Sequence, residues 1–263
     1  TLSYLQQAGF STTIIASFFT PFFSGIFLET DLKTSSRMFE FVFKMFAEGK
    51  ASVPKKGIEA ISQQLVSRLK STQIHYNTLV QKVDEQGIYL EGLPLVESDF
   101  TIIATEANNL VSGLKNQETL WKSCYCFYFE TQEDPIKKSI IGLVPGDHLI
   151  NNLHFVSHLT NSKTNTLSVT VVDAQSLSKK ALIEKVKQEL ETFCDIKVGP
   201  LKKSYHIPRA LPHLSNIQNE IDATETQLTG NIFLAGDLTL NGSLNAAMRA
   251  GELAAEAILE KIT

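Results

Sequence analysis

The chain has 263 residues, of which 43% are hydrophobic and 20% are charged, and its formal net charge at pH 7 is −4. These are ordinary values for a globular protein, and the length allows one large domain or two lobes around a substantial core. The acidic balance lacks the basic footprint of nucleic-acid-binding proteins, so we expect no nucleic-acid partner.

Three cysteines, Cys124, Cys126 and Cys194, cannot all pair within one chain. Two of them alternate along an apparent strand, which favours reduced core residues in a cytoplasmic protein over a disulfide or metal site. Residues 1–13 contain no basic residue, so no signal peptide is predicted.

The longest apolar run, from Ile14 to Leu28, is too short to span a bilayer and contains Pro21 and Gly25. If this helix packs inside a compact lobe, it is part of the core. If it lies exposed on the surface, it could anchor the protein to a membrane. Peripheral association with a membrane is therefore an open alternative to a purely cytoplasmic protein.

The first 24 residues predict a short helix to about Gln7, a turn at Gly9, and a second helix capped near Ser11 that Pro21 ends or bends. Ten of the sixteen phenylalanines lie between Phe10 and Phe46. Such rings are either plain helix core or the wall of an apolar pocket. The candidates for contact with an apolar substrate are Phe18, Phe19, Phe22, Phe23, Phe39 and Phe43.

Two further helices are predicted before the pattern changes. Ser35 to Glu48 has a wide apolar surface and ends at Gly49, so it should be buried or face a lipid-like ligand. A second, amphipathic helix carries apolar residues at Ile58, Ile61, Leu65 and Leu69.

From residue 74 to residue 172 the pattern is that of strands, with glycine and proline turns between them. An antiparallel sheet with one covered face fits the second half of this region. The helix from Ser178 to Phe193 follows it, with a solvated outer face. The predicted strands are Ile74–Asn77, Leu79–Val83, Ile88–Leu90, Thr101–Thr105, Trp121–Glu130, Ile140–Val144, His154–His158 and Leu167–Val172.

The last thirty residues form a strand, a loop and a helix. Residues 231–235 are an apolar run that suits a strand buried on both faces, and Gly236-Asp237 follows at its carboxyl end. A polar loop containing Gly242 leads to Ser243, where a helical pattern begins with a face of small residues that includes Ala247. A carboxylate at a strand end, beside a helix N-terminus, can hold a ribose-like hydroxyl and an anionic oxygen. An ordinary strand–turn–helix unit without a ligand has the same spacing.

This ending resembles the carboxy-terminal FAD-binding signature of the flavin-containing amine oxidase superfamily, and most of all its phytoene desaturase-like branch. The matching residues are Ala-Gly-Asp at 235–237, Gly-Ser-Leu at 242–244, and Gly-x-x-Ala-Ala at 251–255. The resemblance implies that Asp237 binds the ribityl or phosphate region of FAD, and that the backbone at Ser243 and Leu244 faces the isoalloxazine ring. It places Gly236, Gly242 and Ala247 in the same site.

Weaker matches extend the resemblance over the rest of the chain. The Pro-Phe-x-x-Gly segment at 21–25 is similar to part of the family's substrate lobe, and Ile-Pro-x-Ala-Leu-Pro at 207–212 to the segment that re-enters its FAD domain. The family places the backbone of a residue at the position of Val80 against adenine; a valine in the core of a sheet is the alternative.

The resemblance implies an α+β fold in two parts. A substrate-binding lobe, with a mixed or antiparallel sheet and covering helices, would comprise 1–49 and 111–201. The partial carboxy-terminal half of a Rossmann-like FAD-binding domain would comprise 50–110 and 202–263.

One expected motif does not occur. No two glycines stand two apart, so the sequence has no Gly-x-Gly-x-x-Gly loop to hold the FAD pyrophosphate. We therefore expect this chain to be the carboxy-terminal portion of a longer parent, and to bind FAD weakly or not at all by itself.

The sequence indicates no other catalytic machinery. A nucleophile elbow of the Gly-x-Ser-x-Gly type is absent, and no metal site is predicted. His154 and His158 would lie on one side of a strand but too far apart for easy co-ligation. A flavin enzyme needs few catalytic side chains, because the cofactor carries the hydride chemistry.

The resulting hypothesis is part of an FAD-dependent oxidoreductase that acts on an apolar, polyene-like or isoprenoid-like small molecule. An amine oxidase-type flavoenzyme is one alternative. An isolated domain or binding module without activity of its own is the other. The catalytic residues, the substrate, the electron acceptor and the oligomeric state are not predicted.

Overall fold

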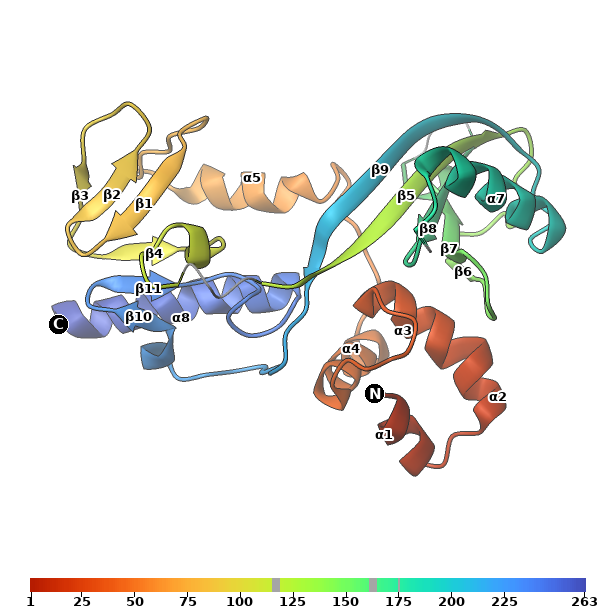
Figure 1. Cartoon of the computed structure of the whole chain (residues 1–263), viewed down its shortest axis with the longest axis horizontal. Coiled ribbons are helices and arrows are strands. Elements are labelled where there is room, and N and C mark those ends of the chain that lie inside the picture. Colours follow the sequence, from red (N-terminus) through yellow and green to blue (C-terminus); the bar gives the residue numbers. More distant parts are fainter. Residues whose placement is uncertain (115–118, 161–164, 175) are drawn as a thin grey trace. The chain divides into compact units, whose positions relative to one another are not determined.

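The computed structural model describes residues 1–114, 119–160, 165–174 and 176–263 (Figure 1). The chain divides into two compact units, each built from two segments. Unit 1 comprises Thr1–Gln64 and Trp121–Leu211, and unit 2 comprises Leu65–Leu120 and Pro212–Thr263. Their assignment to a substrate lobe and a cofactor domain stays a prediction.

The amino-terminal part of unit 1 is helical. Ser11 and Ser35 cap the helices that follow them, since each hydroxyl accepts a hydrogen bond from a backbone N–H in the first turn. Both starts were predicted. The helices are α1 (Leu2–Gln7), α2 (Thr12–Ile14), the π-helix η1 (Ile15–Phe19), α3 (Thr20–Phe27), α4 (Ser36–Glu48) and α5 (Glu59–Arg68), the last of which crosses the boundary between the units.

The sequence predicts that Pro21 ends or bends a helix, but the helix does not end there. The helical backbone continues from α2 through η1 into α3, and Pro21 lies in the first turn of α3. Because the helix continues through this point, Pro21 is not at a free helix start, and its missing N–H removes one intrahelical hydrogen bond. The irregularity is the π turn just before it, where the N–H of Thr20 bonds to the carbonyl of Ile15.

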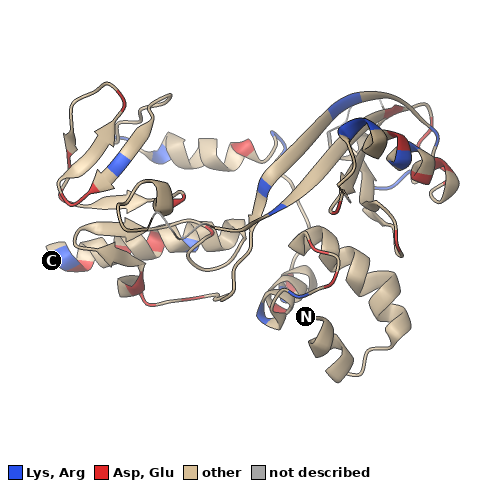
Figure 2. Cartoon of the chain, in the orientation of Figure 1, with Lys and Arg blue, Asp and Glu red and all other residues tan. Residues whose placement is uncertain are grey.

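Phenylalanine rings form the core of these helices. Phe19, Phe23, Phe27 and Phe39 are almost fully buried, and the ring centroids of Phe23 and Phe39 lie 4.8 Å apart. Burial of each such ring contributes about 1.5–3 kcal/mol. The first 28 residues contain no charged side chain, so α1, α2 and α3 are tan throughout in Figure 2.

The rest of unit 1 is a five-stranded sheet in the order β6-β7-β8-β5-β9. In the register, Phe127 lies opposite Val169, and Val169 lies opposite Leu153, so one face of the central strands is apolar. Helix α7 (Lys179–Thr192) packs on that face through three buried residues. The strands are β5 (Trp121–Thr131), β6 (Gly142–Leu143), β7 (Ile150–Phe155), β8 (Thr166–Val171) and β9 (Val198–Pro212).

Three of the predicted strands differ from the structure. Residues 74–77 form no strand, and only Gly142–Leu143 of the predicted 140–144 pairs in the sheet. The predicted strand from His154 to His158 is divided, because β7 ends at Phe155 and the short helix α6 (Ser157–Thr160) follows. His158 thus lies on a helix, where its Nε2 is 2.5 Å from an oxygen of Asp134.

Unit 2 contains two small sheets. One is antiparallel and consists of β1 (Val80–Asp84), β2 (Gly87–Leu90) and β3 (Val96–Glu97). In the other, β11 (Ile232–Leu234) pairs in parallel with β4 (Thr101–Ile103) and antiparallel with β10 (Gln227–Thr229). The short 3₁₀ helices η2 (Ala107–Asn109) and η3 (Ala223–Thr226) complete it with α8 (Leu244–Ile262).

Helix α8 packs through small residues on one side. Ala254 and Ala257 are buried against Phe233 of β11, and Ala246 and Ala250 against Leu240. Alanine side chains allow the helix axis to approach the sheet closely, so α8 is held directly beside the strand that precedes it. The α+β class with mixed and antiparallel sheets is confirmed. Within the described residues, every helix is too short or too polar to cross a bilayer.

Candidate functional site

The candidate site lies at the carboxyl ends of the two parallel strands of unit 2. Leu234 of β11 lies opposite Ile103 of β4, and the N–H of Ala235 bonds to the carbonyl of Ile103 at 2.9 Å. Because the strands are parallel, the residues that follow them, Thr105 and Asp237 among them, leave the same edge of the sheet. Ligands of open α/β sheets bind at such edges.

Gly236 makes the turn that brings Asp237 to this edge. Its φ is +106°, a conformation that L side chains rarely adopt. The carbonyl of Gly236 accepts a hydrogen bond from the N–H of Thr239 at 3.2 Å, which closes a tight loop. A side chain at this position would strain the backbone, so the glycine fixes the direction of the loop.

The carboxyl of Asp237 is half-buried. Burial raises its pKa above the usual value of 3.8, and the backbone N–H groups of Asp237 and Leu238 offset this only in part. In the described part of the chain no ion pair involves Asp237. A desolvated acceptor of this kind fits a ligand hydroxyl that donates to it.

Ser243 fixes the start of α8. Its Oγ accepts a hydrogen bond from the N–H of Ala246 at 3.1 Å and donates to Oδ1 of Asn241 at 2.7 Å. Asn241 is buried and donates from Nδ2 to the carbonyl of Gln218. The loop between strand and helix is therefore held by partly buried side-chain hydrogen bonds, which fix the position of the positive end of the helix dipole.

A cavity of about 380 Å³ adjoins the strand ends, and its volume lies within the range of small-molecule sites. It has apolar walls and several polar groups, including Glu106 and Gln218, that sequence reasoning missed. The family resemblance places the strand end at Thr105 near the cofactor, but Glu106 and Gln218 carry no recognisable local signal. The lining residues are Thr105, Glu106, Ala107, Asn108, Leu114, Thr119, Gln218, Ile221, Glu225, Leu234, Ala235, Leu238 and Thr239.

The predicted cofactor residues fall into two groups. The first group occupies the single loop and helix start just described: Gly236, Asp237, Gly242, Ser243, Leu244 and Ala247. Val80 lies apart from them on β1, opposite Leu90, and packs against the apolar cluster of Val83, Ile103 and Ile232.

The six phenylalanines predicted to contact substrate also divide. Phe19, Phe23 and Phe39 are buried among other rings, while Phe18 and Phe43 are 39% and 44% exposed. The half-buried Phe22 stacks on Phe18 with centroids 5.4 Å apart. The first three serve as core, and the outer three form an aromatic surface on η1, α3 and α4.

The sheet of unit 1 presents a polar face that the sequence did not single out. Opposite the face covered by α7, the register aligns Tyr128 with Ser168, and Ser168 with His154. A hydrogen bond with Cys126, together with burial, raises the pKa of Tyr128 to about 12, and burial lowers the pKa of His154. The alternation in 121–130 indicated a two-faced strand, but only the register shows which side chains meet.

Comparison with known proteins identifies the family. A model of the flavin containing amine oxidoreductases matches residues 1–259. The chain belongs to this family. A search of the curated proteins finds no match.

Solved structures show the corresponding fold. An oxidoreductase from Methanosarcina mazei superposes with a TM-score of 0.72 at 15% identity, over 98% of this chain and 67% of that one. A fatty acid isomerase from P. acnes gives 0.59 at 13% identity, over 76% and 52%. Putrescine oxidase bound to putrescine gives 0.53 at 15% identity, over 78% and 53%. The chain thus spans about two thirds of the first protein and about half of the other two.

Membership of the flavin containing amine oxidoreductase family implies a flavin cofactor, and the candidate site fits one. Asp237 is a desolvated acceptor for a ribityl or ribose hydroxyl, and the capped start of α8 suits an electron-rich group. A phytoene desaturase-like nearest relative is not shown by these comparisons.

Proposed function

We propose that this chain is part of an FAD-dependent oxidoreductase that acts on an apolar substrate by hydride transfer to or from flavin. The observation that carries the proposal is the half-buried carboxylate of Asp237, which forms no ion pair with the described residues, at the shared edge of β4 and β11 beside the capped start of α8. The family match over 1–259 supports it.

The role of the chain's own residues would be to bind and orient the cofactor. Asp237 would accept a hydrogen bond from a hydroxyl of the cofactor, and the buried Asn241–Ser243 pair would keep the helix start in place. The small residues Ala247 and Gly251 leave room for a large group on α8; a Cβ at Gly251 would meet nothing within 4 Å. Bound FAD would supply the hydride chemistry itself.

An apolar substrate is favoured by the aromatic surface of unit 1. Phe18 and Phe22 lie within the first 28 residues, which carry no charged side chain, and Phe43 lies on α4. A polyene-like or isoprenoid-like molecule would match such rings by dispersion and burial, without needing an ion pair. The fold similarity to a fatty acid isomerase agrees with a substrate of this class.

An amine oxidase-type reaction is the second candidate. The fold similarity to putrescine oxidase favours it, and a cationic substrate would call for acceptor groups such as those of the polar sheet face around Tyr128. The family includes amine oxidoreductases by its description, so the two candidates differ only in substrate.

The test uses the longest natural polypeptide that contains this chain. Under anaerobic conditions, the purified protein is mixed with an aliphatic polyene, an unsaturated fatty acid or a diamine, and bleaching of its flavin absorption is followed. We expect bleaching, or substrate-dependent isomerisation, with the apolar compounds. Bleaching by the diamine alone would favour the second candidate. For the 263-residue chain by itself we expect weak FAD binding.

A further inference from the structure

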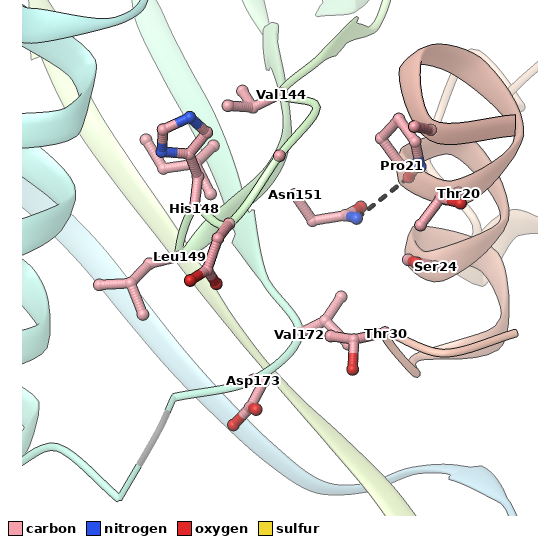
Figure 3. A pocket seen from close by; sticks show the side chains of 14 residues that line it. Thr20, Pro21, Ser24, Thr30, Val144, His148, Leu149, Asn151, Val172 and Asp173 are labelled. Atoms are coloured by element: carbon pink, nitrogen blue, oxygen red, sulfur yellow. Dashed lines mark hydrogen bonds between the residues drawn. The ribbon is translucent and has the colours of Figure 1, made fainter. Parts of the chain in front are cut away.

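A second cavity, of about 440 Å³, lies wholly within unit 1 and plays no part in the flavin proposal (Figure 3). Helix residues of η1 and α3 form one wall, and the segment that leads from β6 into β7 forms the other, with the end of β8 below. The lining residues are Ala16, Thr20, Pro21, Ser24, Thr30, Val144, Gly146, Asp147, His148, Leu149, Ile150, Asn151, Val172 and Asp173.

The buried end of this cavity holds an unpaired hydroxyl. Ser24 is 4% exposed, and within the described residues no group forms a hydrogen bond with its Oγ. Its side chain points from α3 into the cavity (Figure 3). A serine inside a helix often bonds back to the carbonyl four residues earlier, but Ser24 does not. A buried hydroxyl without a partner costs about 1–3 kcal/mol, so a ligand atom at this place would be stabilised.

The wall around Ser24 is held rigidly. Nδ2 of Asn151 donates a hydrogen bond to the carbonyl of Pro21 at 3.0 Å, and Nδ2 of Asn152 donates to Oδ1 of Asn151 at 2.7 Å. α3 approaches β7 so closely that a Cβ at Gly25 would lie 2.4 Å from Oδ1 of Asn151. The cavity is therefore preformed, because α3 cannot move inward to close over the hydroxyl.

The outer end of the cavity is acidic. Asp147 and Asp173 are exposed at its rim, and the described lining residues include no lysine or arginine. Between the rim and Ser24 the wall is mixed: Pro21, Val144 and Val172 are aliphatic, while Thr20, Thr30, His148 and Asn151 also line it. The cavity thus offers carboxylates at its rim, aliphatic side chains along its wall and the hydroxyl of Ser24 at its buried end.

We propose that this cavity binds a small amino alcohol. The ammonium group lies at the rim with Asp147, the aliphatic chain lies along Pro21 and Val144, and the hydroxyl at the other end exchanges a hydrogen bond with Ser24. The charged ammonium group is placed at the rim, where Asp147 supplies a carboxylate, and not at the deep end beside the neutral hydroxyl of Ser24. All of its lining residues belong to unit 1, whereas the residues of the flavin site belong to unit 2.

Three probes separate the contributions of the two ends. Aminobutanol has both polar groups, butylamine lacks the hydroxyl, and butanol lacks the charge. We expect aminobutanol to bind in the millimolar range in NMR titrations, about threefold to tenfold tighter than butylamine, as one neutral hydrogen bond allows. The affinity of aminobutanol should exceed that of butanol by up to about fivefold at low salt, and by less at high salt.

Ser24→Ala should abolish the difference in affinity between aminobutanol and butylamine. Asp147→Asn should abolish the difference in affinity between aminobutanol and butanol. Asp195→Asn removes an exposed carboxylate elsewhere in unit 1 and should change neither. Ser24→Ala should fold normally, since it removes a hydroxyl that has no hydrogen-bond partner among the described residues. If this variant does not fold, Ser24→Cys, with a weak donor of similar size, is the second variant.

Two results would overturn the proposal. One is the absence of aminobutanol binding to the unmodified protein in the millimolar range. The other is binding that both Ser24 variants leave unchanged, since the ligand would then lie elsewhere. Within this second result, loss of binding in Asp237→Ala would assign the ligand to unit 2.

Discussion

At the scale of single residues, the account rests on the carboxylate of Asp237. Asp237→Ala should lower FAD affinity about tenfold or more, because a hydrogen bond to a charged acceptor contributes about 1.5–3 kcal/mol. FAD affinity is measured by titration of the longest natural polypeptide. Asp99→Ala is the matched control, since Asp99 is exposed and precedes β4, at the opposite end of the parallel strands. Equal affinity in the two variants would remove Asp237 from the site.

The same carboxyl predicts a pH dependence of stability. Its pKa in the folded chain lies above the ordinary 3.8, so the ionised form destabilises the folded state relative to the protonated form. Asp237→Asn should therefore melt at a higher temperature than the unmodified, flavin-free protein at neutral pH. The difference should shrink as the pH falls through the raised pKa, and vanish below 3.8. A difference that grows on acidification would contradict the assigned shift.

The sequence identified those site residues whose signal is local. Gly236 and Asp237 stand next to each other after an apolar run, and Ser243 opens a helical pattern, so all three could be read from neighbouring residues. Glu106 and Gln218 could not, because they reach the cavity from segments more than a hundred residues apart. Ser24 reads as an ordinary helix residue until its lack of a partner is seen.

At the scale of elements, the start of α8 can be tested against the start of α7. Ser243 and Ser178 are both N-cap residues whose hydroxyls accept a backbone hydrogen bond, at 3.1 and 3.3 Å. Replacing either by alanine should cost about 1 kcal/mol, measured by denaturant unfolding followed by circular dichroism. Only Ser243→Ala should also weaken FAD binding. Weaker FAD binding in Ser178→Ala as well would show a general effect of instability.

The attachment of α3 to β5 predicts a large loss of stability. Nζ of Lys122 donates to Oε2 of Glu29 at 2.5 Å, and these side chains are only 13% and 11% exposed. Lys122→Met would leave the Glu29 carboxylate buried without its cation, which typically costs about 3–5 kcal/mol. The measurement is urea unfolding followed by the fluorescence of Trp121, the chain's single tryptophan.

The control for Lys122 is the exposed pair of Lys33 and Asp31, whose side chains are 81% and 47% exposed. Lys33→Met should cost at most about 1 kcal/mol, because water and salt screen an exposed pair. Similar losses in the two variants would mean that the pair of Lys122 and Glu29 is not what holds α3 in place.

Elements were predictable where caps and periodicity agreed. The start of α2 followed from the cap at Ser11, and the helices predicted from apolar spacing at 35–48 and 178–193 correspond to α4 and α7. The errors came from weaker signals. Residues 74–77 have strand-like composition but no partner strand in the described chain, and an apolar run that includes His154 does not show where β7 gives way to α6.

At the scale of the whole molecule, the α+β class and the family could be predicted from the sequence, because several different motifs of the family occur between Pro21 and Ala255. The pairing of distant strands was not. β4 and β11 are separated by more than a hundred residues, and it is their parallel contact that puts Thr105 and Asp237 on one edge. The residues of either strand alone do not indicate which strand it pairs with.

The central claim, that this chain contributes the Asp237–Ser243 side of an FAD site, is tested most directly by flavin content. The longest natural polypeptide that contains the chain is purified, and its absorption spectrum is recorded before and after release of the bound cofactor. The account predicts flavin bands at close to one FAD per chain, and a clear loss of them in Asp237→Ala but not in Asp99→Ala. A colourless protein that takes up no added FAD would contradict it, as would an Asp237→Ala variant with unchanged flavin content.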